Sequence, residues 1–217
     1  MARIKNQSFD QPYVIGIDPS IAGTAAAVLW RDGTLRVCRF ESTPGHRYHR
    51  IVRFRNTIRD ILGWLTHLAM PAHARWIEIE GYAFAAAFKA HPAGEFGGLL
   101  RAAIFDVYQM FPHETAPTSL KLFATGNGRA DKDVVVRCVS EEWHHRCGSH
   151  DEADAIVAAK IAACRVGFAD PIGQHQHEAL AVVRKKRKPL SRPSSGKPGR
   201  KKKNRDPQET LPFESED

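Results

Sequence analysis

The order of the secondary structure expected at the start of the chain restricts the fold more than any other feature. Apolar runs predict three consecutive strands over residues 13–18, 24–30 and 34–40, and the dipeptide Asp32-Gly33 joins the last two as a turn. A long amphipathic helix is expected over 47–68, where apolar residues recur at helical spacing. This order differs from the strict strand–helix–strand alternation of a dinucleotide-binding fold.

The remainder of the chain predicts two more strands and several helices. A fourth strand is expected over 75–80, a helix over 93–110 and a short fifth strand just before Pro117. Two later helices are expected over 132–143, entered by Asp131, and over 151–166, entered by Ser149 or His150. Strands and helices in this order predict an α/β domain with a mixed sheet.

The charge of the chain is concentrated at its C-terminal end. Twelve of the 32 Lys and Arg residues and five of the 24 Asp and Glu residues lie in 184–217, which therefore holds +7 of the net charge of +8. This end is also rich in Pro, Ser and Gly and contains few large apolar residues, a composition that cannot offset the entropy of ordering. We expect a folded domain over 1–182 and a disordered basic tail over 183–217.

Several classes of protein are excluded by what the sequence lacks. No apolar stretch approaches the roughly 18 residues of a membrane helix, and no apolar run of about 7–15 residues follows the first charges as a secretory signal would. The expected location is therefore intracellular. The four cysteines form no Cys-x-x-Cys pair, which in a reducing compartment indicates buried thiols.

Acidic residues stand at three separate points where expected elements begin or end. Asp18 ends the first strand, and Glu80 ends the fourth, although Glu78 lies two residues back on the same side and stays an alternative. Asp151 and Asp154 are three residues apart in the last helix, so they share a face. Acids at a helix start also simply complement the helix dipole, but this explains Asp154, within an Ala/Ile/Val-rich stretch, less well.

Carboxylates from three segments are the ligands that Mg²⁺ prefers, with water and substrate phosphate completing the coordination. Two such ions about 4 Å apart activate a water and stabilise the leaving oxygen when a phosphodiester is cleaved. The acids therefore predict a Mg²⁺ site that acts on a phosphodiester.

Four motifs in order resemble one known family. They are GIDPS at 16–20, IEGYAF at 79–84, Lys121 with TGNGRADK ending at 132, and DEADAIVAA at 151–159. Over about residues 12–167 the chain resembles the RuvC-type Holliday junction resolvases of the ribonuclease H-like superfamily. The GNGRADK segment is more similar to the phage and mobile-element branch, which also cuts other branched DNA.

The resemblance implies a ribonuclease H-like fold, a five-stranded mixed sheet flanked by helices, in a homodimer. It implies Mg²⁺-dependent paired nicks in four-way DNA junctions, with Mn²⁺ able to substitute for Mg²⁺. The implied location is the cytoplasm, at the nucleoid, or the host cytoplasm if the chain is viral. The preferred branch and the sequence at the cut stay open.

Site residues follow from the same resemblance by position. The implied metal ligands and catalytic residues are Asp18, Glu80, Asp151 and Asp154, with His150 as an alternative to Asp151. The implied DNA-binding residues are Lys121, Lys132 and Arg129. The aromatic residues that follow Glu80, namely Tyr82, Phe84 and Phe88, either wedge into a junction or pack in the protein.

Two further segments contain residue types found in binding sites. In the tail, Gln208, Leu211 and Phe213 resemble the peptide that binds a bacterial sliding clamp, and the basic residues before them fit salt-sensitive phosphate binding. The run His144-His145-x-Cys147-x-x-His150 matches no structural zinc spacing, so a solvated helix end is the better interpretation.

Two other functions use the same kind of fold. One is a structure-specific DNA-binding protein without catalysis, which the complete set of acids argues against. The other is a ribonuclease H-like ATPase, suggested by Asp18 with Gly23-Thr24 but disfavoured by the acids of the last helix. A metal-dependent endonuclease on branched DNA is the leading expectation.

Overall fold

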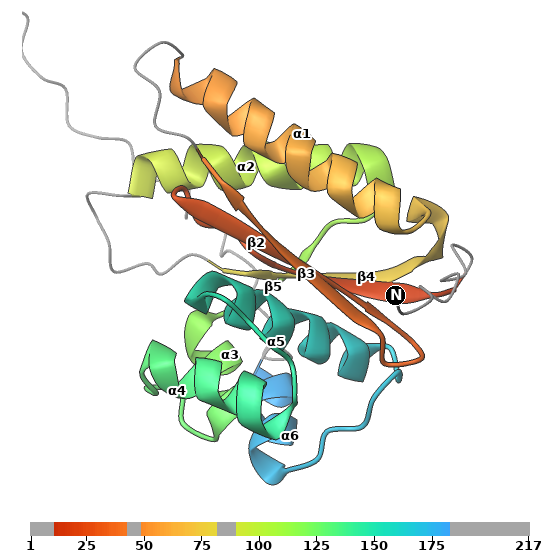
Figure 1. Ribbon diagram of the computed structural model, residues 1–217, viewed down its shortest axis with the longest axis vertical. Coiled ribbons are helices and arrows are strands. Elements are labelled where there is room, and N and C mark those ends of the chain that lie inside the picture. Colours follow the sequence, from red (N-terminus) through yellow and green to blue (C-terminus); the bar gives the residue numbers. More distant parts are fainter. Residues whose placement is uncertain (1–10, 43–48, 82–89, 183–217) are drawn as a thin grey trace, which may run out of the picture. The chain divides into compact units, whose positions relative to one another are not determined.

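One five-stranded sheet organises the structure, a computed structural model that describes residues 11–42, 49–81 and 90–182. The strands are β1 (Tyr13–Asp18), β2 (Gly23–Trp30), β3 (Leu35–Glu41), β4 (Ala74–Glu80) and β5 (His113–Thr115). Their order in the sheet is β3-β2-β1-β4-β5 (Figure 1). The first three strands are antiparallel, and β4 is parallel to both β1 and β5. The predicted mixed sheet is confirmed.

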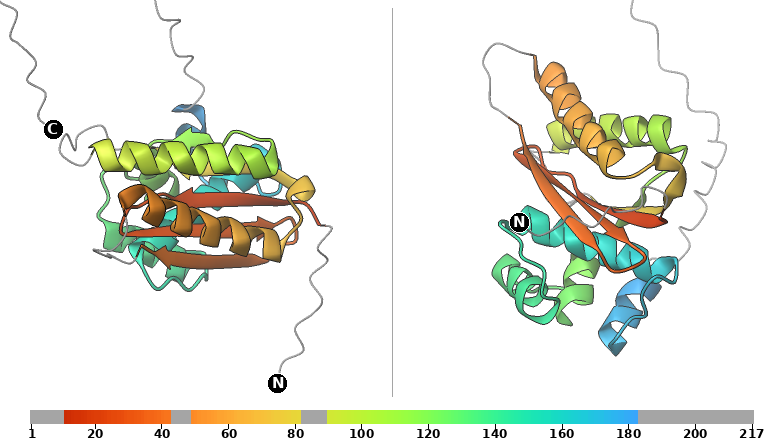
Figure 2. Two further views of the ribbon diagram at one scale, coloured as in Figure 1. Left: turned by 90° about the horizontal axis from the view of Figure 1, so that it is seen from above. Right: turned by 45° about the vertical axis from the view of Figure 1, so that its right-hand side comes forward.

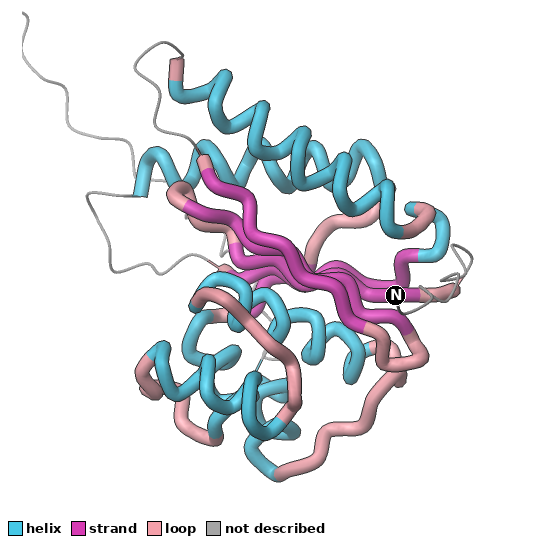
Figure 3. The backbone as a smooth tube through the Cα atoms, viewed as in Figure 1, coloured by secondary structure: helices cyan, strands magenta, loops and turns pink. Residues whose placement is uncertain are grey.

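Helices cover both faces of this sheet. One face carries α1 (Arg50–Leu68) and α2 (Ala90–Tyr108), which lie side by side in Figures 1 and 2. The other face carries α5 (His150–Arg165), and beyond it lie α3 (Pro117–Thr125), α4 (Lys132–Arg137) and α6 (Gln174–Val182). A short 3-10 turn, η1 (Pro71–His73), precedes β4. Figure 3 shows the sheet between the two sets of helices.

The alternation of side chains along β1 explains why its sequence is almost continuously apolar. Tyr13, Ile15 and Ile17 pack in the core with α1 and α2. Val14 packs in the second core with α5, and Gly16 and Asp18 follow it on that face. A strand buried on both faces needs apolar residues at nearly every position. The same alternation directs Asp18 toward the start of α5.

Three features of the helices were not predicted. The expected helix 132–143 is α-helical only to Arg137 and continues as a π-helix, η2 (Cys138–Glu142). The helices α3 and α6 were not expected, although Pro117 occupies the first turn of α3, where a missing N–H costs nothing. Helix α6 is the last described element and ends at Val182.

Helix α5 packs directly on β1 because Gly16 has no side chain. A Cβ at Gly16 would lie only 2.2 Å from the carbonyl oxygen of Ala155 and 2.2 Å from the amide nitrogen of Ala159. Both contacts are backbone atoms of α5, which cannot move away without shifting the helix. This close approach brings the first turns of α5 against the end of β1.

Replacing Gly16 with Ala should strongly destabilise the protein. Overpacking against backbone is expected to cost about 3 kcal/mol or more, which lowers the melting temperature by roughly 6–12 °C for a domain of this size. Gly63→Ala is the matched control, because a Cβ there meets nothing within 4 Å and Gly63 lies exposed in α1. Thermal denaturation of both variants checks this, and equal melting temperatures would contradict the packing argument.

Candidate active site

Three carboxylates meet at the edge of the sheet where β1 and β4 both end. Ile17 lies opposite Ile79 in the parallel ladder, so Asp18 and Glu80 come next to each other. Asp154 reaches the same place from α5. Ligand oxygens of Asp18, Glu80 and Asp154 all lie within 4.8 Å of one another, and we call these residues the acid group. Asp18 is 6% exposed and Asp154 is 7% exposed.

The start of α5 is held by a reciprocal cap. The Ser149 hydroxyl accepts a hydrogen bond from the amide of Glu152 at 3.2 Å, and the Glu152 carboxylate accepts one from the amide of Gly148. This capping arrangement stabilises the first turn of the helix. It explains Glu152 as a structural residue and places Asp154 one turn further along, over β1.

The acid group is electrostatically unfavourable without a cation. Burial, followed by the charge of Glu80 and a hydrogen bond with it, raises the pKa of Asp18 far above its ordinary value. Burial and the charge of Glu80 also raise the pKa of Asp154, to about 6. A bound cation would restore the charged forms that buried, crowded carboxylates disfavour. Hard anionic oxygens in a confined site are the donors that Mg²⁺ takes, so the residues fit a divalent ion.

Asp151 lies beside the acid group and is paired with a cation. Its Oδ2 accepts a hydrogen bond from Nε of Arg39 on β3 at 2.8 Å. Its charge still raises the pKa of both Asp18 and Asp154. Three of the four predicted ligands are therefore brought together, and the fourth is held next to them. Arg39 carries no functional signal in the sequence, since its role depends on strand pairing.

His150, the alternative to Asp151, points to a different partner. Its Nε2 lies 2.7 Å from Oδ1 of Asp133 in α4, and both side chains are exposed. The His144 to His150 run forms no metal-binding cluster, because within residues 11–42, 49–81 and 90–182 the acid group is the one set of three or more suitable ligands. In this run His144 and His150 are exposed, whereas His145 and Cys147 are partly buried.

Glu78 is fully buried, makes several hydrogen bonds and lies outside the acid group. Its Oε2 accepts from Trp76 Nε1 at 2.8 Å and from Arg165 Nε at 2.9 Å. Its Oε1 lies 3.0 Å from Nδ1 of His113 and accepts from the hydroxyl of Thr115. Four partners from β4, β5 and α5 make Glu78 a structural residue. Of the two glutamates that the sequence left open, Glu80 is the one in the acid group.

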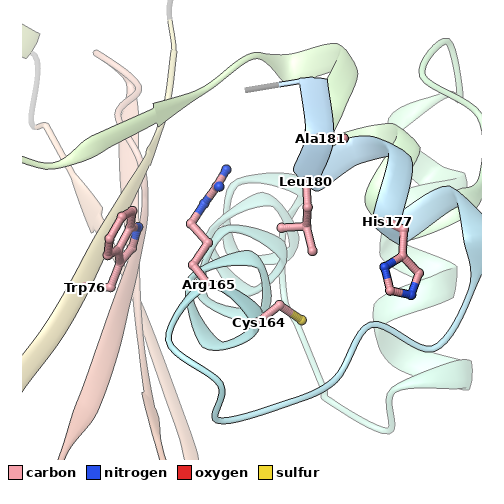
Figure 4. Close-up of a pocket in the computed structure, with 6 residues that line it drawn as sticks. All are labelled: Trp76, Cys164, Arg165, His177, Leu180 and Ala181. Atoms are coloured by element: carbon pink, nitrogen blue, oxygen red, sulfur yellow. The ribbon is translucent and has the colours of Figure 1, made fainter. Parts of the chain in front are cut away.

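The network around Glu78 borders a pocket at the opposite end of α5. Trp76, Arg165 and His177 line this pocket together with Cys164, Leu180 and Ala181 (Figure 4). Asp154 stands in the second turn of α5 and Arg165 is its last residue, so about 16 Å of helix separates their backbones. The pocket is therefore separate from the acid group.

Two predicted DNA-binding lysines lie near the acid group. Lys121 in α3 and Lys132 at the start of α4 both lower the pKa of Asp154, which opposes the effect of its acidic neighbours. The ammonium of Lys121 donates to the carbonyl of Ala130 at 2.7 Å. Arg129 lies exposed between them. The two lysines therefore lie close enough to offset part of the charge of the acid group, and Arg129 stands in the loop between them.

Other predicted residues fall outside the described part of the chain. These are Tyr82, Phe84 and Phe88 after β4, and Gln208, Leu211 and Phe213 in the tail. Their predicted roles stay predictions. In the part of the chain that the structure describes, none of the helices has the length and apolar character needed to cross a membrane.

Sequence relatives place the chain in a family. The crossover junction endodeoxyribonuclease RuvC of Anaeromyxobacter dehalogenans strain 2CP-C is 34% identical over 164 residues, which cover 73% of this chain and 84% of that protein. The chain belongs to the RuvC family. RuvC of Anaeromyxobacter sp. strain Fw109-5 is 31% identical over 146 residues, covering 67% of this chain and 69% of that protein. No protein-family model matches the chain.

Solved RuvC structures share the fold described above. The Thermus thermophilus RuvC structure has a TM-score of 0.55 with 22% identity, and the match covers 74% of this chain and 99% of the T. thermophilus chain. The structure of T. thermophilus RuvC in complex with Holliday junction substrate has a TM-score of 0.56 with 20% identity and the same coverage. The predicted RuvC and ribonuclease H-like fold is confirmed.

Proposed function

We propose that this RuvC-family protein is a Mg²⁺-dependent endonuclease that resolves four-way DNA junctions by paired phosphodiester hydrolysis. The observation that carries the proposal is the acid group, in which three carboxylates from β1, β4 and α5 lie within 4.8 Å of one another. A protein that only bound DNA would gain nothing from gathering three carboxylates, two of them buried, because this costs stability.

The acids and the lysines have different tasks in this proposal. Asp18, Glu80 and Asp154 would hold Mg²⁺, or Mn²⁺ in its place, with Asp151 assisting. A bound ion supplies charge stabilisation at the phosphodiester and activates water. Lys121 and Lys132 bind the DNA backbone, and the bond from Lys121 to the Ala130 carbonyl fixes where its ammonium lies.

The choice of a four-way junction rests on the relatives. Their name is crossover junction endodeoxyribonuclease, and the T. thermophilus relative was solved with a Holliday junction. Two copies of the chain, each with one acid group, would make the paired nicks. The Gly126 to Lys132 segment resembles that of the phage and mobile-element branch, so we extend the proposed substrates to other branched DNA. A protein acting on such DNA would work at the nucleoid.

Cleavage of a panel of synthetic DNAs tests the proposal. The panel contains a mobile four-way junction, a flap and a linear duplex, each with Mg²⁺, Mn²⁺ or EDTA. We expect symmetric nicks in the junction with either metal, slower cutting of the flap, and no cutting in EDTA or of the duplex. Equal cutting of junction and duplex, or cutting in EDTA, would refute the proposed substrate or the proposed metal dependence.

Deleting residues 184–217 should weaken DNA binding without removing the chemistry. The segment holds twelve cations, and the slope of log affinity against log salt should fall by about 0.9 for each phosphate that these cations neutralise. Binding measured at several salt concentrations and cleavage at saturating protein check this. Unchanged salt dependence would contradict it. The deletion also removes the peptide 208–213, so loss of binding to a bacterial sliding clamp is expected as well.

A further inference from the structure

A row of residues across four strands continues the acid group toward β3. Ala25 on β2 lies opposite Asp18 on one side and opposite Arg39 on the other. Directly opposed residues in antiparallel strands point to the same face of the sheet. By these pairings Glu80, Asp18, Ala25 and Arg39 form one row. The row lies on the face of the sheet that packs against α5, and Figure 1 shows α5 covering this face. The row begins with two acids and ends with a cation.

Arg39 is seated at the end of this row by several contacts. Its Nε donates to Oδ2 of Asp151 at 2.8 Å, and its Nη1 donates to Oε1 of Glu41 at 2.5 Å. The guanidinium lies against Gly23, where a Cβ would come within 2.1 Å of Nη2. The side chains of Arg39 and Asp151 are only 28% and 20% exposed, whereas Glu41 is 76% exposed. The fork of the guanidinium thus spans an inner and an outer carboxylate.

We propose that Arg39 is a positioning residue that holds Asp151 by one oxygen beside the acid group and offsets its charge. The inference rests on the proposed function, in which the acid group binds a divalent ion. Among the described residues, Arg39 is the one whose side chain holds the Asp151 carboxylate, and it does so through Oδ2. Planar, two-pronged pairing suits Arg and not Lys, whose ammonium acts as a point charge.

Loss of Arg39 should therefore have two opposite effects. Removing a nearby positive charge makes the site more negative and should tighten binding of a divalent ion by roughly 3–10-fold. The acid group holds its three ligands without Asp151, so charge dominates the affinity. Asp151 would lose its fixed orientation, and outer-shell losses of this kind typically slow a reaction by roughly 10–100-fold. If Arg39 were merely structural, its loss would not raise the metal affinity while lowering the cleavage rate.

A double-mutant cycle in EDTA tests the contact without metal. We expect Arg39→Gln to lower the melting temperature by a few degrees more in the parent than in an Asp151→Asn background. Equal shifts in both backgrounds would show that Arg39 does not act through Asp151, which overturns the inference. This result stands even if the parent binds no metal, an outcome that would refute the proposed function separately.

Titration with Mn²⁺ alone and junction cleavage at saturating Mn²⁺ test the consequence. Arg39→Gln should bind Mn²⁺ more tightly and cut more slowly, whereas Arg39→Lys should keep the parental affinity and still cut more slowly. Arg36→Gln is the matched control, since it removes the same charge from an exposed position on β3. Values for Arg39→Gln equal to those of Arg36→Gln would overturn the inference. If Arg39→Gln does not fold, a parental cleavage rate in Arg39→Lys would overturn it.

Discussion

An Asp18→Asn variant is expected to lose junction cleavage while becoming more stable in the absence of metal. Asp18 is 6% exposed, and burial with the neighbouring Glu80 and Asp154 raises its pKa. Loss of a metal ligand should reduce the cleavage rate by roughly 10³-fold or more, in line with the several kcal/mol that a metal contributes. Asn keeps the size of the side chain but removes one of three crowded charges.

The gain in stability follows from the direction of the pKa shift. The unfolded carboxyl loses its proton at lower pH than the folded one, so stability falls as pH rises from the unfolded pKa toward the folded pKa. At pH 8 in EDTA the parent carries this cost and the variant does not. We expect a gain of about 1–3 kcal/mol, or roughly 3–8 °C, and a smaller gain at pH 5. Calorimetry at both pH values measures it.

Asp60→Asn is the matched control for this experiment. Asp60 lies exposed in α1, on the opposite face of the sheet. Its substitution by Asn removes the same charge as Asp18→Asn. It should leave both the cleavage rate and the melting temperature close to the parental values. Parental cleavage by Asp18→Asn, or a melting temperature lowered in EDTA, would contradict our account of the acid group.

The two glutamates of β4 are expected to respond in opposite ways to the same substitution. Glu78→Gln should destabilise the protein by about 2–4 kcal/mol, because it leaves the nearly buried Arg165 without its charge partner. Glu80→Gln should leave the fold intact and reduce junction cleavage by roughly 10³-fold, because it removes a metal ligand. Each variant serves as the control for the other.

Denaturant unfolding and cleavage at saturating Mg²⁺ distinguish these effects. Glu78→Gln should cut at close to the parental rate at a temperature where it stays folded. If Glu78→Gln instead lost cleavage without losing stability, and Glu80→Gln did the reverse, the assignment of the two residues would have to be exchanged.

The strands and the strand-end acids could be predicted because local sequence determines them. Each of β1 and β2 is a run of six to eight buried residues, which few other structures accommodate. Asp18 stands out because a carboxylate directly follows such a run. The spacing of Asp151 and Asp154 likewise placed both on one face of a helix.

The remaining features depend on contacts between distant parts of the chain. Period-two alternation puts Glu78 and Glu80 on the same face. Their roles differ because of the partners of Glu78, which include Arg165, 87 residues away. Asp151 looks equivalent to Asp154 until its bond to Arg39, 112 residues away, is known. The π-helix after α4 and the nine-residue α3 and α6 are too short or irregular for a helical period to reveal them.

Cleavage of a four-way junction by Asp154→Asn, beside Asp133→Asn, tests the central claim most directly. Both substitutions remove one aspartate charge near the start of a helix, but Asp154 belongs to the acid group and Asp133 is exposed and paired with His150. With Mg²⁺ present, we predict junction binding by both variants, close to parental cleavage by Asp133→Asn, and a loss of roughly 10³-fold for Asp154→Asn. Equal cleavage by the two variants would contradict the proposal that the acid group is the catalytic metal site.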